Sequence, residues 1–449
     1  MKAILRRHWF FILLLCVLSI FYLHGVAKIP FHPDESTFIF MSGEFERTLS
    51  APLELTWNNS ADLTPTMRYR MIDAPLTRYL IGFSRILAGI PSPENDWDWS
   101  ATWQENVYAG AYPESRTLVV ARLSVAFLFP FSLLLLYLIG LKLQGRFLGI
   151  AAVLLFSFHP LILLHTRRAM AEGVLIFTVL LVLYTLFYAE RHPFLAGLAV
   201  ALAFNAKHSA ALLLPIGLFA AGWTSWSSHT RFGQIVSNLM RFTVGFILIT
   251  LLLNPYLWRN PFSAIQTALV QRNALLERQL DDFMHIAPAQ VLDGPGKRAA
   301  VAAAQVFIAP PVFAEVGNYA EFTEATETAY LESSSSQTGR QPWWAGLLIG
   351  ISLLGLMYSF RVAIEKHNPL RRDYVIFLLS FLSISIGTAS LVHLAWQRYY
   401  LPLVPFIALL AGLGLVWGIK TSHAIFSHGR LFVRLSEILT QFTPNSRVP

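Results

Sequence analysis

Long apolar runs recur along this chain of 449 residues and constrain its fold more than any other feature. Residues 9–27 contain no Asp, Glu, Lys or Arg and are long enough to cross a bilayer. Further apolar windows cover 117–141, 147–165, 171–188, 194–206, 208–224, 237–255, 342–360, 374–394 and 399–419. Because 194–206 and 208–224 are short, they are typical of half-spans or tilted helices. The sequence predicts an all-α polytopic membrane protein with about ten transmembrane helices.

The composition agrees with this fold class. Hydrophobic residues make up 55% of the chain and charged residues 13%, whereas soluble domains carry about 25% charged residues. The single cysteine, Cys16, lies in the first span and excludes an intrachain disulfide. The N-terminal apolar run is longer than that of a secretory signal peptide, so we expect an uncleaved first span.

The distribution of charge predicts the orientation in the membrane. If the N-terminus is cytoplasmic, the short inner segments are basic, with Lys142, Arg146 and Arg191 among them, and the outer segments hold most of the acids. The positive-inside rule applies to such short segments. We therefore expect both termini in the cytoplasm and a plasma (inner) membrane location. The net charge of +8 is a topology signal and does not indicate nucleic-acid binding.

This topology divides the chain into three parts. Residues 1–255 form an N-terminal transmembrane catalytic module that includes a long extracytoplasmic loop, 28–116. Residues 256–341 form a second extracytoplasmic loop, and residues 342–449 form C-terminal transmembrane helices with a short cytoplasmic tail. Each loop is expected to carry an amphipathic juxtamembrane helix: residues 75–90 place Arg78 and Arg85 opposite their apolar side, as in an interfacial helix, and a helical pattern covers 263–285.

An acidic pair, Asp34-Glu35, follows the first span directly and is held at the membrane surface. Paired carboxylates at such a boundary suit proton abstraction, metal binding or sugar chemistry on a lipid-borne substrate. A solvated loop with helix-capping acids has the same sequence pattern. With His32, the pair could also bind a divalent cation, although three ligands form a sparse set.

Four further polar clusters lie at the predicted outer ends of the spans. They are His165–Glu172 (with Arg167 and Arg168), Lys207-His208, Asn254–Pro261, and His393–Pro402 (with Arg398 and Tyr399). Any one of them could be a helix end with cations that reach toward lipid headgroups. Several cations beside an acidic pair, however, describe a site that can hold a phosphate and accept a proton. Trp97, Trp99 and Trp103 suggest membrane-belt anchors or a sugar-stacking surface, and Gly346-x-x-x-Gly350 suggests helix packing.

In this order and topology the chain resembles the C-type (GT-C) membrane glycosyltransferases of family 39, which include protein O-mannosyltransferases and the bacterial lipid A aminoarabinose transferase. The resemblance covers nearly the whole chain and is carried by Asp34-Glu35, Pro75-Leu76 at the start of the amphipathic segment, Arg167 five residues before Glu172, Lys207 in Phe-Asn-Ala-Lys-His-Ser-Ala, Asn254-Pro-Tyr-Leu-Trp, and Arg398-Tyr-x-Leu-Pro. Glu172 stands where many relatives have Asp, and the large soluble domain of the protein O-mannosyltransferases is missing, which puts a folded-protein acceptor in doubt.

The resemblance implies transfer of a sugar, with inversion, from a polyprenyl-monophosphate donor (undecaprenyl or dolichyl) on the extracytoplasmic face. The acceptor would be a hydroxyl of a lipid, polysaccharide or protein. Asp34 would be the general base, and Glu35 would orient the acceptor or Asp34, or bind a cation. Arg167, Arg168, Lys207 and Arg398 would bind the donor phosphate, with Glu172, Asp73 and Tyr399 in support. No cofactor is implied with certainty, a divalent cation being possible.

Two other classes of function remain open at this point. A secondary transporter or flippase for an anionic or lipid-linked substrate also uses membrane-embedded cations. Its functional groups would be expected near the midplane, whereas these cluster on one side, and no internal repeat is evident. A non-catalytic membrane scaffold is the third possibility. Replacing Asp34 with Asn separates them, because only an enzyme should lose turnover while it keeps its fold.

Overall fold

The computed structural model describes residues 2–58, 63–223, 232–315, 319–333 and 340–425. Within these ranges the secondary structure is helical, apart from one isolated β-bridge between Val291 and Leu394. Most of the predicted C-terminal tail lies outside the described residues.

In the described part of the chain, six helical stretches are long and apolar enough to cross a membrane: His8–Lys28, Ser115–Leu143, Phe232–Leu253, Pro342–Ile364, Arg371–Leu391 and Gln397–Ser422. Four shorter apolar stretches cover Arg146–Ser157, Ala171–Leu186, Pro193–Ala206 and His208–Gly222. These stretches fall on the apolar windows of the sequence. The protein is therefore an all-α integral membrane protein, as predicted.

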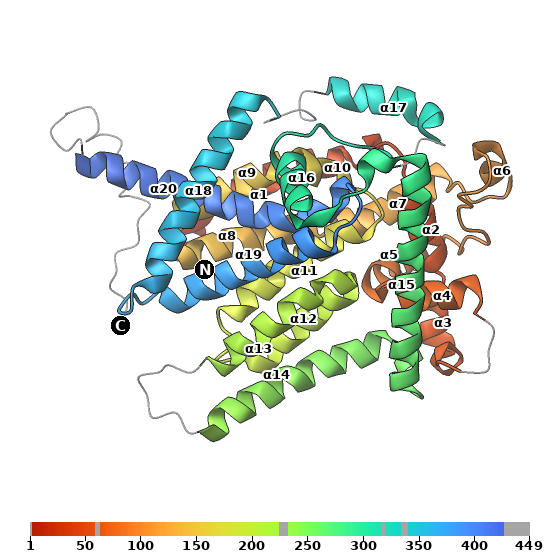
Figure 1. Cartoon of the computed structure of the whole chain (residues 1–449), viewed down its shortest axis with the longest axis horizontal. Helices are drawn as coiled ribbons and strands as arrows, with labels where there is room; N and C mark the ends of the chain where they lie inside the picture. The colour runs from red at the N-terminus through yellow and green to blue at the C-terminus, as the bar shows by residue number, and fades with distance from the viewer. Residues whose placement is uncertain (1, 59–62, 224–231, 316–318, 334–339, 426–449) are drawn as a thin grey trace.

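Most helices of the bundle run across the view of Figure 1. It consists of α1 (Lys2–His24), α7 (Ser115–Ala126), α8 (Phe129–Leu143), α9 (Arg146–Ser157), α10 (Pro160–His165), α11 (Ala171–Leu186), α12 (Pro193–Ala206), α13 (Leu214–Gly222), α14 (Phe232–Leu253), α18 (Pro342–Ile364), α19 (Arg371–Leu391) and α20 (Val404–Ile425). The window 147–165 is thus two helices. Pro160 explains the break, since the residue before a proline disfavours helical geometry.

The first outer segment forms short helices at one end of the bundle, at the right of Figure 1, which we call the loop end. They are α2 (Pro33–Met41), α3 (Glu44–Ser50), α4 (Pro65–Ile72), α5 (Pro75–Leu87) and α6 (Trp103–Tyr108). From the second outer segment, α15 (Pro261–Ile286) runs across this end of the bundle (Figure 1), and α16 (Gly294–Phe307) and α17 (Ala320–Glu332) follow it in the chain. The loop end thus combines both long segments.

Helix α5 forms where amphipathicity predicts it, but its arginines do not face water. Arg78 and Arg85 are buried, and they pair with Glu44 (3.2 Å) and Glu46 (2.9 Å) of α3. Phe83 is among the apolar side chains that α5 exposes instead. The carboxylates of α3 neutralise the arginines inside the protein, so that the outward face of α5 is apolar.

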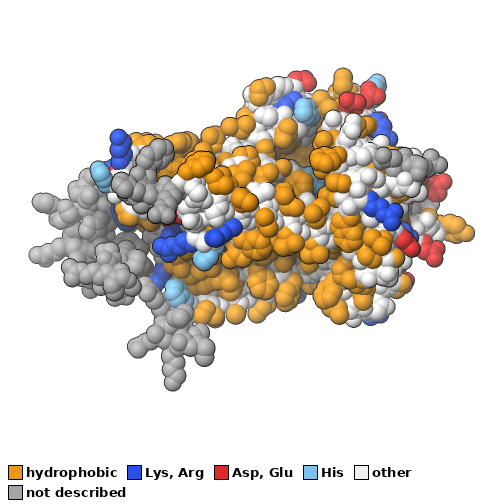
Figure 2. All heavy atoms as spheres, turned by 90° about the horizontal axis from the view of Figure 1, so that it is seen from below, with side chains coloured by type: hydrophobic (Ala, Val, Ile, Leu, Met, Phe, Trp, Pro, Cys, Tyr) orange, Lys and Arg blue, Asp and Glu red, His pale blue; other side chains and the backbone are white. Residues whose placement is uncertain are grey.

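Charged residues lie at the two ends of the molecule, and apolar side chains cover much of the surface between them (Figure 2). At the end opposite the loop end, Lys142 pairs with Asp373 (3.2 Å) and Arg372 approaches Glu190 (3.9 Å). All four residues come from segments predicted to be on the inner side. The structure therefore places predicted inner and predicted outer charges at different ends of one bundle.

Two glycines allow α18 and α20 to approach closely. A Cβ on Gly355 of α18 would lie 1.8 Å from the Leu410 carbonyl oxygen of α20, and one on Gly414 would lie 1.9 Å from the Ile351 carbonyl oxygen. A Cβ on Gly346 or Gly350, in contrast, would meet no described residue outside its own turn of α18 within 4 Å. The prediction that Gly346-x-x-x-Gly350 packs helices is wrong for the described chain, because the close α18–α20 contact lies further along α18.

We expect Gly355→Leu to destabilise the bundle by about 3 kcal/mol, since the new side chain must push α20 away. Gly350→Leu adds the same side chain to the same helix where there is room for it. Thermal unfolding in detergent compares the two variants with the wild type. Equal melting temperatures for both variants would contradict the packing of α18 on α20.

Candidate functional site

Asp34 lies in the first turn of α2, and local sequence explains why the helix begins there. Pro33 occupies the first helical position, where a missing N–H costs nothing. His32 precedes it in an extended conformation; its Nδ1 accepts a hydrogen bond from the Asp34 backbone N–H (3.1 Å), and its own N–H donates to Glu35 (3.1 Å). This reciprocal capping box fixes the start of the helix. A carboxylate there is also favoured by the helix dipole.

The Asp34 carboxylate makes one strong contact. Its Oδ2 accepts from Nη1 of Arg398, in the turn that precedes α20. No hydrogen bond to its Oδ1 occurs within the described part of the chain, and the side chain is 25% exposed. One carboxylate oxygen is therefore held in place, while the other remains available to a substrate.

Arg398 connects several elements of the loop end. Its Nε lies 3.3 Å from Oε1 of Glu315, in the segment before α17, and its guanidinium lies 5.0 Å from the Trp396 ring centre. The Tyr399 ring centre is 5.7 Å away. Glu315 is almost completely buried, which would raise the pKa of its carboxyl, but the charges of Arg398 and His32 outweigh that effect and hold the pKa well below its usual value.

Lys207 is the second cation of the site. It follows α12, and its Nζ donates to Oε1 of Glu172, in the first turn of α11, at 2.8 Å. Because α11 and α12 are consecutive helices that pack against each other, the end of one lies beside the start of the other. The Lys207 ammonium also lies 4.8 Å from the Tyr399 ring centre, so this ring contacts both Lys207 and Arg398. Predicted residues from four distant segments therefore meet here.

Glu35 belongs to a different environment from its neighbour Asp34. It is completely buried; its oxygens accept from Nε (2.8 Å) and Nη2 (2.7 Å) of Arg122 in α7, and from the Ala169 backbone N–H (2.8 Å). Burial would raise the pKa of Glu35, but the Arg122 charge and hydrogen bonds outweigh it and lower that pKa. Glu35 thus ties three segments together and does not present its carboxylate to an acceptor.

Arg167 and Arg168 are also engaged away from Asp34. The Arg167 guanidinium lies 4.7 Å from the Tyr22 ring centre, against α1. Arg168 is buried and donates to the Phe313 carbonyl oxygen (2.9 Å). The sequence suggested that these arginines lie in a loop at the outer ends of two spans. In the fold the segment between α10 and α11 is buried, and both side chains contact the protein around it.

Asp73, at the end of α4, lies within range of several charges of the site. Burial raises the pKa of Asp73, while the charges of Arg272 and Arg78 act in the opposite direction. Arg272 comes from α15, is partly buried, and makes no hydrogen bond or ion pair with the described residues. It is therefore a third cation near the site, and among the described residues no carboxylate bonds to it, unlike Lys207 and Arg398.

The proposed metal ligands do not converge. His32 points its Nε2 at Glu315 (2.6 Å), Glu35 is bound by Arg122, and Asp34 by Arg398. In the described ranges no group of three His, Cys, Asp or Glu side chains is arranged to hold a metal ion. The residues present thus do not fit a cation site built on His32, Asp34 and Glu35.

The tryptophans of the first outer segment form part of an aromatic cluster. Trp97 is buried, 5.4 Å from the Trp103 ring centre, and Trp103 stacks on Phe322 of α17 at 5.0 Å. Phe31, next to His32, packs against both tryptophans. This cluster joins the two outer segments beside Asp34, whereas Trp99 stays exposed.

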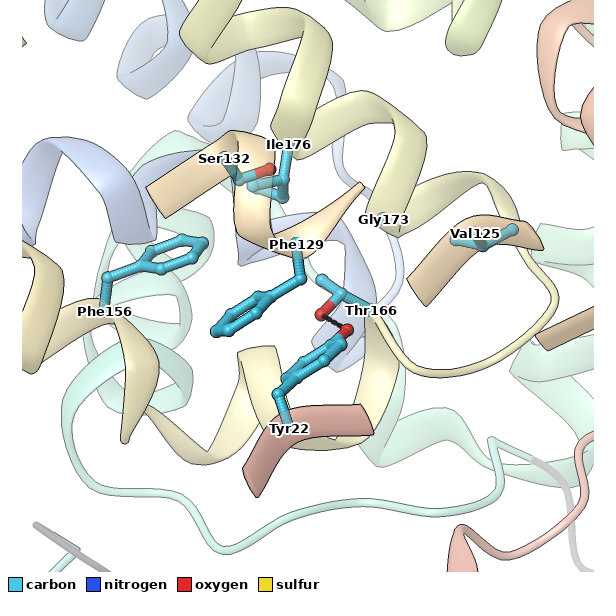
Figure 3. A pocket seen from close by; sticks show the side chains of 8 residues that line it. All are labelled: Tyr22, Val125, Phe129, Ser132, Phe156, Thr166, Gly173 and Ile176. Atoms are coloured by element: carbon cyan, nitrogen blue, oxygen red, sulfur yellow. Dashed lines mark hydrogen bonds between the residues drawn. The ribbon is translucent and has the colours of Figure 1, made fainter. Parts of the chain in front are cut away.

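A small cavity lies inside the bundle between α1, α8, α9 and α11 (Figure 3). The Tyr22 hydroxyl and the Thr166 Oγ1 hydrogen-bond across its edge at 2.7 Å, and Phe129 and Ile176 are among the residues that line it. Its volume of about 10 Å³ is the space of roughly one water molecule. It is too small for a sugar or a phosphate.

Three residues of the site were not predicted from the sequence. Arg122 lies within an apolar window, and a basic residue there is costly enough to signal a buried acidic partner. Glu315 and Arg272 lie in the long second outer segment, where no pattern separates them from neighbouring polar residues.

Comparison with known proteins gives structural matches only. No protein-family model and no curated protein sequence matches the chain. The archaeal oligosaccharyltransferase AglB from Archaeoglobus fulgidus, in complex with an inhibitory peptide and a dolichol-phosphate, matches with a TM-score of 0.50 and 11% identity over 97% of this chain and 54% of that one. ArnT from Cupriavidus metallidurans, bound to undecaprenyl phosphate, matches with a TM-score of 0.51 and 12% identity over 94% of this chain and 64% of that one.

The chain thus spans about half the length of AglB and just under two thirds of ArnT. At these identities the matches report the fold. In fold they agree with the resemblance that the sequence motifs indicate. The chain has the fold of the GT-C membrane glycosyltransferases.

Proposed function

We propose that this protein is an integral-membrane glycosyltransferase that moves a sugar from a polyprenyl-monophosphate donor to an acceptor hydroxyl on the extracytoplasmic face, with inversion. The observation that carries the proposal is the partly exposed Asp34 carboxylate at the loop end, with one oxygen held by Arg398 and the other without a hydrogen bond from the described residues. The fold supports it, since AglB and ArnT share the fold and are described with dolichol-phosphate and undecaprenyl phosphate.

In this reaction Asp34 acts as the general base. The acceptor oxygen bonds to the anomeric carbon of the sugar while the bond from that carbon to the phosphate oxygen breaks. The hydroxyl proton passes to the free Oδ1 of Asp34, and the bonding electrons leave with the polyprenyl phosphate. Because the acceptor attacks the face opposite the phosphate in a single displacement, the configuration at the anomeric carbon inverts.

The leaving phosphate gains negative charge and needs cations in place. Lys207 and Arg398 both lie close to the Tyr399 ring, and Arg272 is a third cation near the same site. Preorganised cations of this kind stabilise the transition state more than water does. Since Glu172 and Glu315 already pair with Lys207 and Arg398, they hold these two side chains in position before the donor arrives.

The stereochemistry of the product tests the proposed mechanism. Wild-type protein is incubated with a polyprenyl-phosphate sugar of known anomeric configuration, and the new glycosidic bond is assigned by NMR. We expect the opposite configuration in the product. Retention would contradict a single displacement with Asp34 as base.

We expect Arg272→Gln to raise the donor KM about tenfold, because it removes a phosphate-binding cation that forms no ion pair with the described residues. The matched control is Arg278→Gln, on the exposed side of the same helix, where the arginine donates to the Ala274 carbonyl oxygen of its own helix. Donor saturation curves measure the effect. The same KM in both variants would remove Arg272 from the phosphate site.

A further inference from the structure

Glu315 closes a ring of side chains around the proposed base. Its Oε2 contacts Nε2 of His32 at 2.6 Å, and its Oε1 lies 3.3 Å from Nε of Arg398. Arg398 in turn binds the Asp34 carboxylate, and the Asp34 backbone N–H donates to Nδ1 of His32. Every member of the ring therefore contacts the next one.

The three chain segments that meet in this ring are far apart in sequence. His32 and Asp34 begin the first outer segment, Glu315 belongs to the second, and Arg398 lies in the turn before α20. Glu315 contacts both residues that hold Asp34: His32, which caps its helix, and Arg398, which binds its carboxylate. Both its oxygens are used, and its side chain is only 8% exposed, so it has no surface left for a substrate.

The two contacts of Glu315 control two different features of the site. Its ion pair with Nε of Arg398 attracts one edge of the guanidinium, while Nη1 of the same group donates to Asp34. Through His32 it fixes the residue that caps α2, and hence the first turn on which Asp34 stands. A shift of about 1 Å in either feature can cost roughly 100-fold in rate, since reacting groups must be held in near-attack geometry.

We propose that Glu315 is a positioning residue, which orients Arg398 toward the proposed phosphate site and holds the start of α2 so that Asp34 meets the acceptor. The second outer segment then contributes a residue to the active site. This inference rests on the proposed function, because it assigns Glu315 a role in that same reaction.

The test is steady-state kinetics of Glu315→Gln on the full chain, in proteoliposomes, with rates normalised to monodisperse folded protein. Glutamine keeps the size of the side chain and removes its charge. We expect kcat to fall about 100-fold and the donor KM to rise, because both the base and the phosphate-binding arginine lose their orientation. Glu324→Gln, on the exposed surface of α17, is the matched control and should match the wild type.

A second variant separates positioning from folding. If Glu315 acts through Arg398, adding Glu315→Gln to Arg398→Lys should lower kcat/KM by much less than it does in the wild type, since residues that act as a unit are non-additive. A purely structural role would lower the yield of folded protein and leave KM unchanged.

The outcomes distinguish the two proposals. An active wild type with an unchanged Glu315→Gln variant, or with fully additive losses in the double variant, would overturn the role of Glu315 and leave the proposed function standing. A wild type without transfer from any polyprenyl-phosphate donor would overturn the proposed function and this inference with it.

Discussion

Asp34→Asn should lower sugar transfer by roughly 10²–10⁴-fold while the protein stays folded, because the amide cannot accept the acceptor proton. The side chain keeps its size at a partly exposed position, and the α2 capping box uses the Asp34 backbone and not its carboxylate. We therefore expect the loss in kcat and little change in melting temperature.

Transfer of labelled sugar in proteoliposomes measures this effect, beside thermal unfolding of the same preparations. Asp98→Asn is the matched control, since Asp98 lies in the same outer segment and bonds to neighbouring Ser100 and not to the site. If Asp34→Asn retained wild-type turnover, Asp34 would not be the base.

Glu35→Gln, one residue further along, should have the opposite profile: a loss of about 3–5 kcal/mol in stability, because it leaves Arg122 buried without its counter-charge. Much of the expressed protein should then fail to fold. Arg122→Met combined with Glu35→Gln should recover part of the loss, since no buried charge remains uncompensated.

Thermal unfolding in detergent tests this pair, with Glu54→Gln, an exposed residue, as the control. Folding lowers the pKa of Glu35 from its ordinary value of 4.5. The stability that the ionised Glu35 contributes is therefore complete above pH 4.5 and is lost as the pH falls from there through the lowered pKa. The difference between wild type and Glu35→Gln should therefore shrink on acidification below pH 4.5. A Glu35→Gln variant as stable as the wild type would contradict a structural role for the pair.

The fold was largely predictable because membrane-spanning helices must bury their backbone polar groups and carry apolar side chains over a fixed length. This one constraint located the apolar helices. The distribution of charged residues among the connecting segments predicted which helix ends lie on the same side. What it could not supply was the packing. The glycines that bring α18 and α20 together are Gly355 and Gly414, since contact depends on which face of each helix meets the other.

The site was predicted only in part, for a related reason. A sequence shows that Asp34 and Glu35 are both acids, but their roles depend on partners that approach from other segments. Arg122 binds both carboxylate oxygens of the buried Glu35, whereas Arg398 binds one oxygen of Asp34. Arg167 and Arg168 resemble phosphate ligands in sequence and turn inward in the fold. Long-range pairs such as Glu315 with His32 leave no local pattern.

The central claim is that a sugar leaves a polyprenyl phosphate on this protein. The most direct measurement is incubation of wild-type proteoliposomes with polyprenyl-phosphate sugars labelled in both sugar and lipid. We predict equal amounts of free polyprenyl phosphate and of sugar bound to an acceptor hydroxyl. Movement of the intact labelled lipid across the bilayer, with no release of the polyprenyl phosphate, would contradict the account and identify a flippase instead.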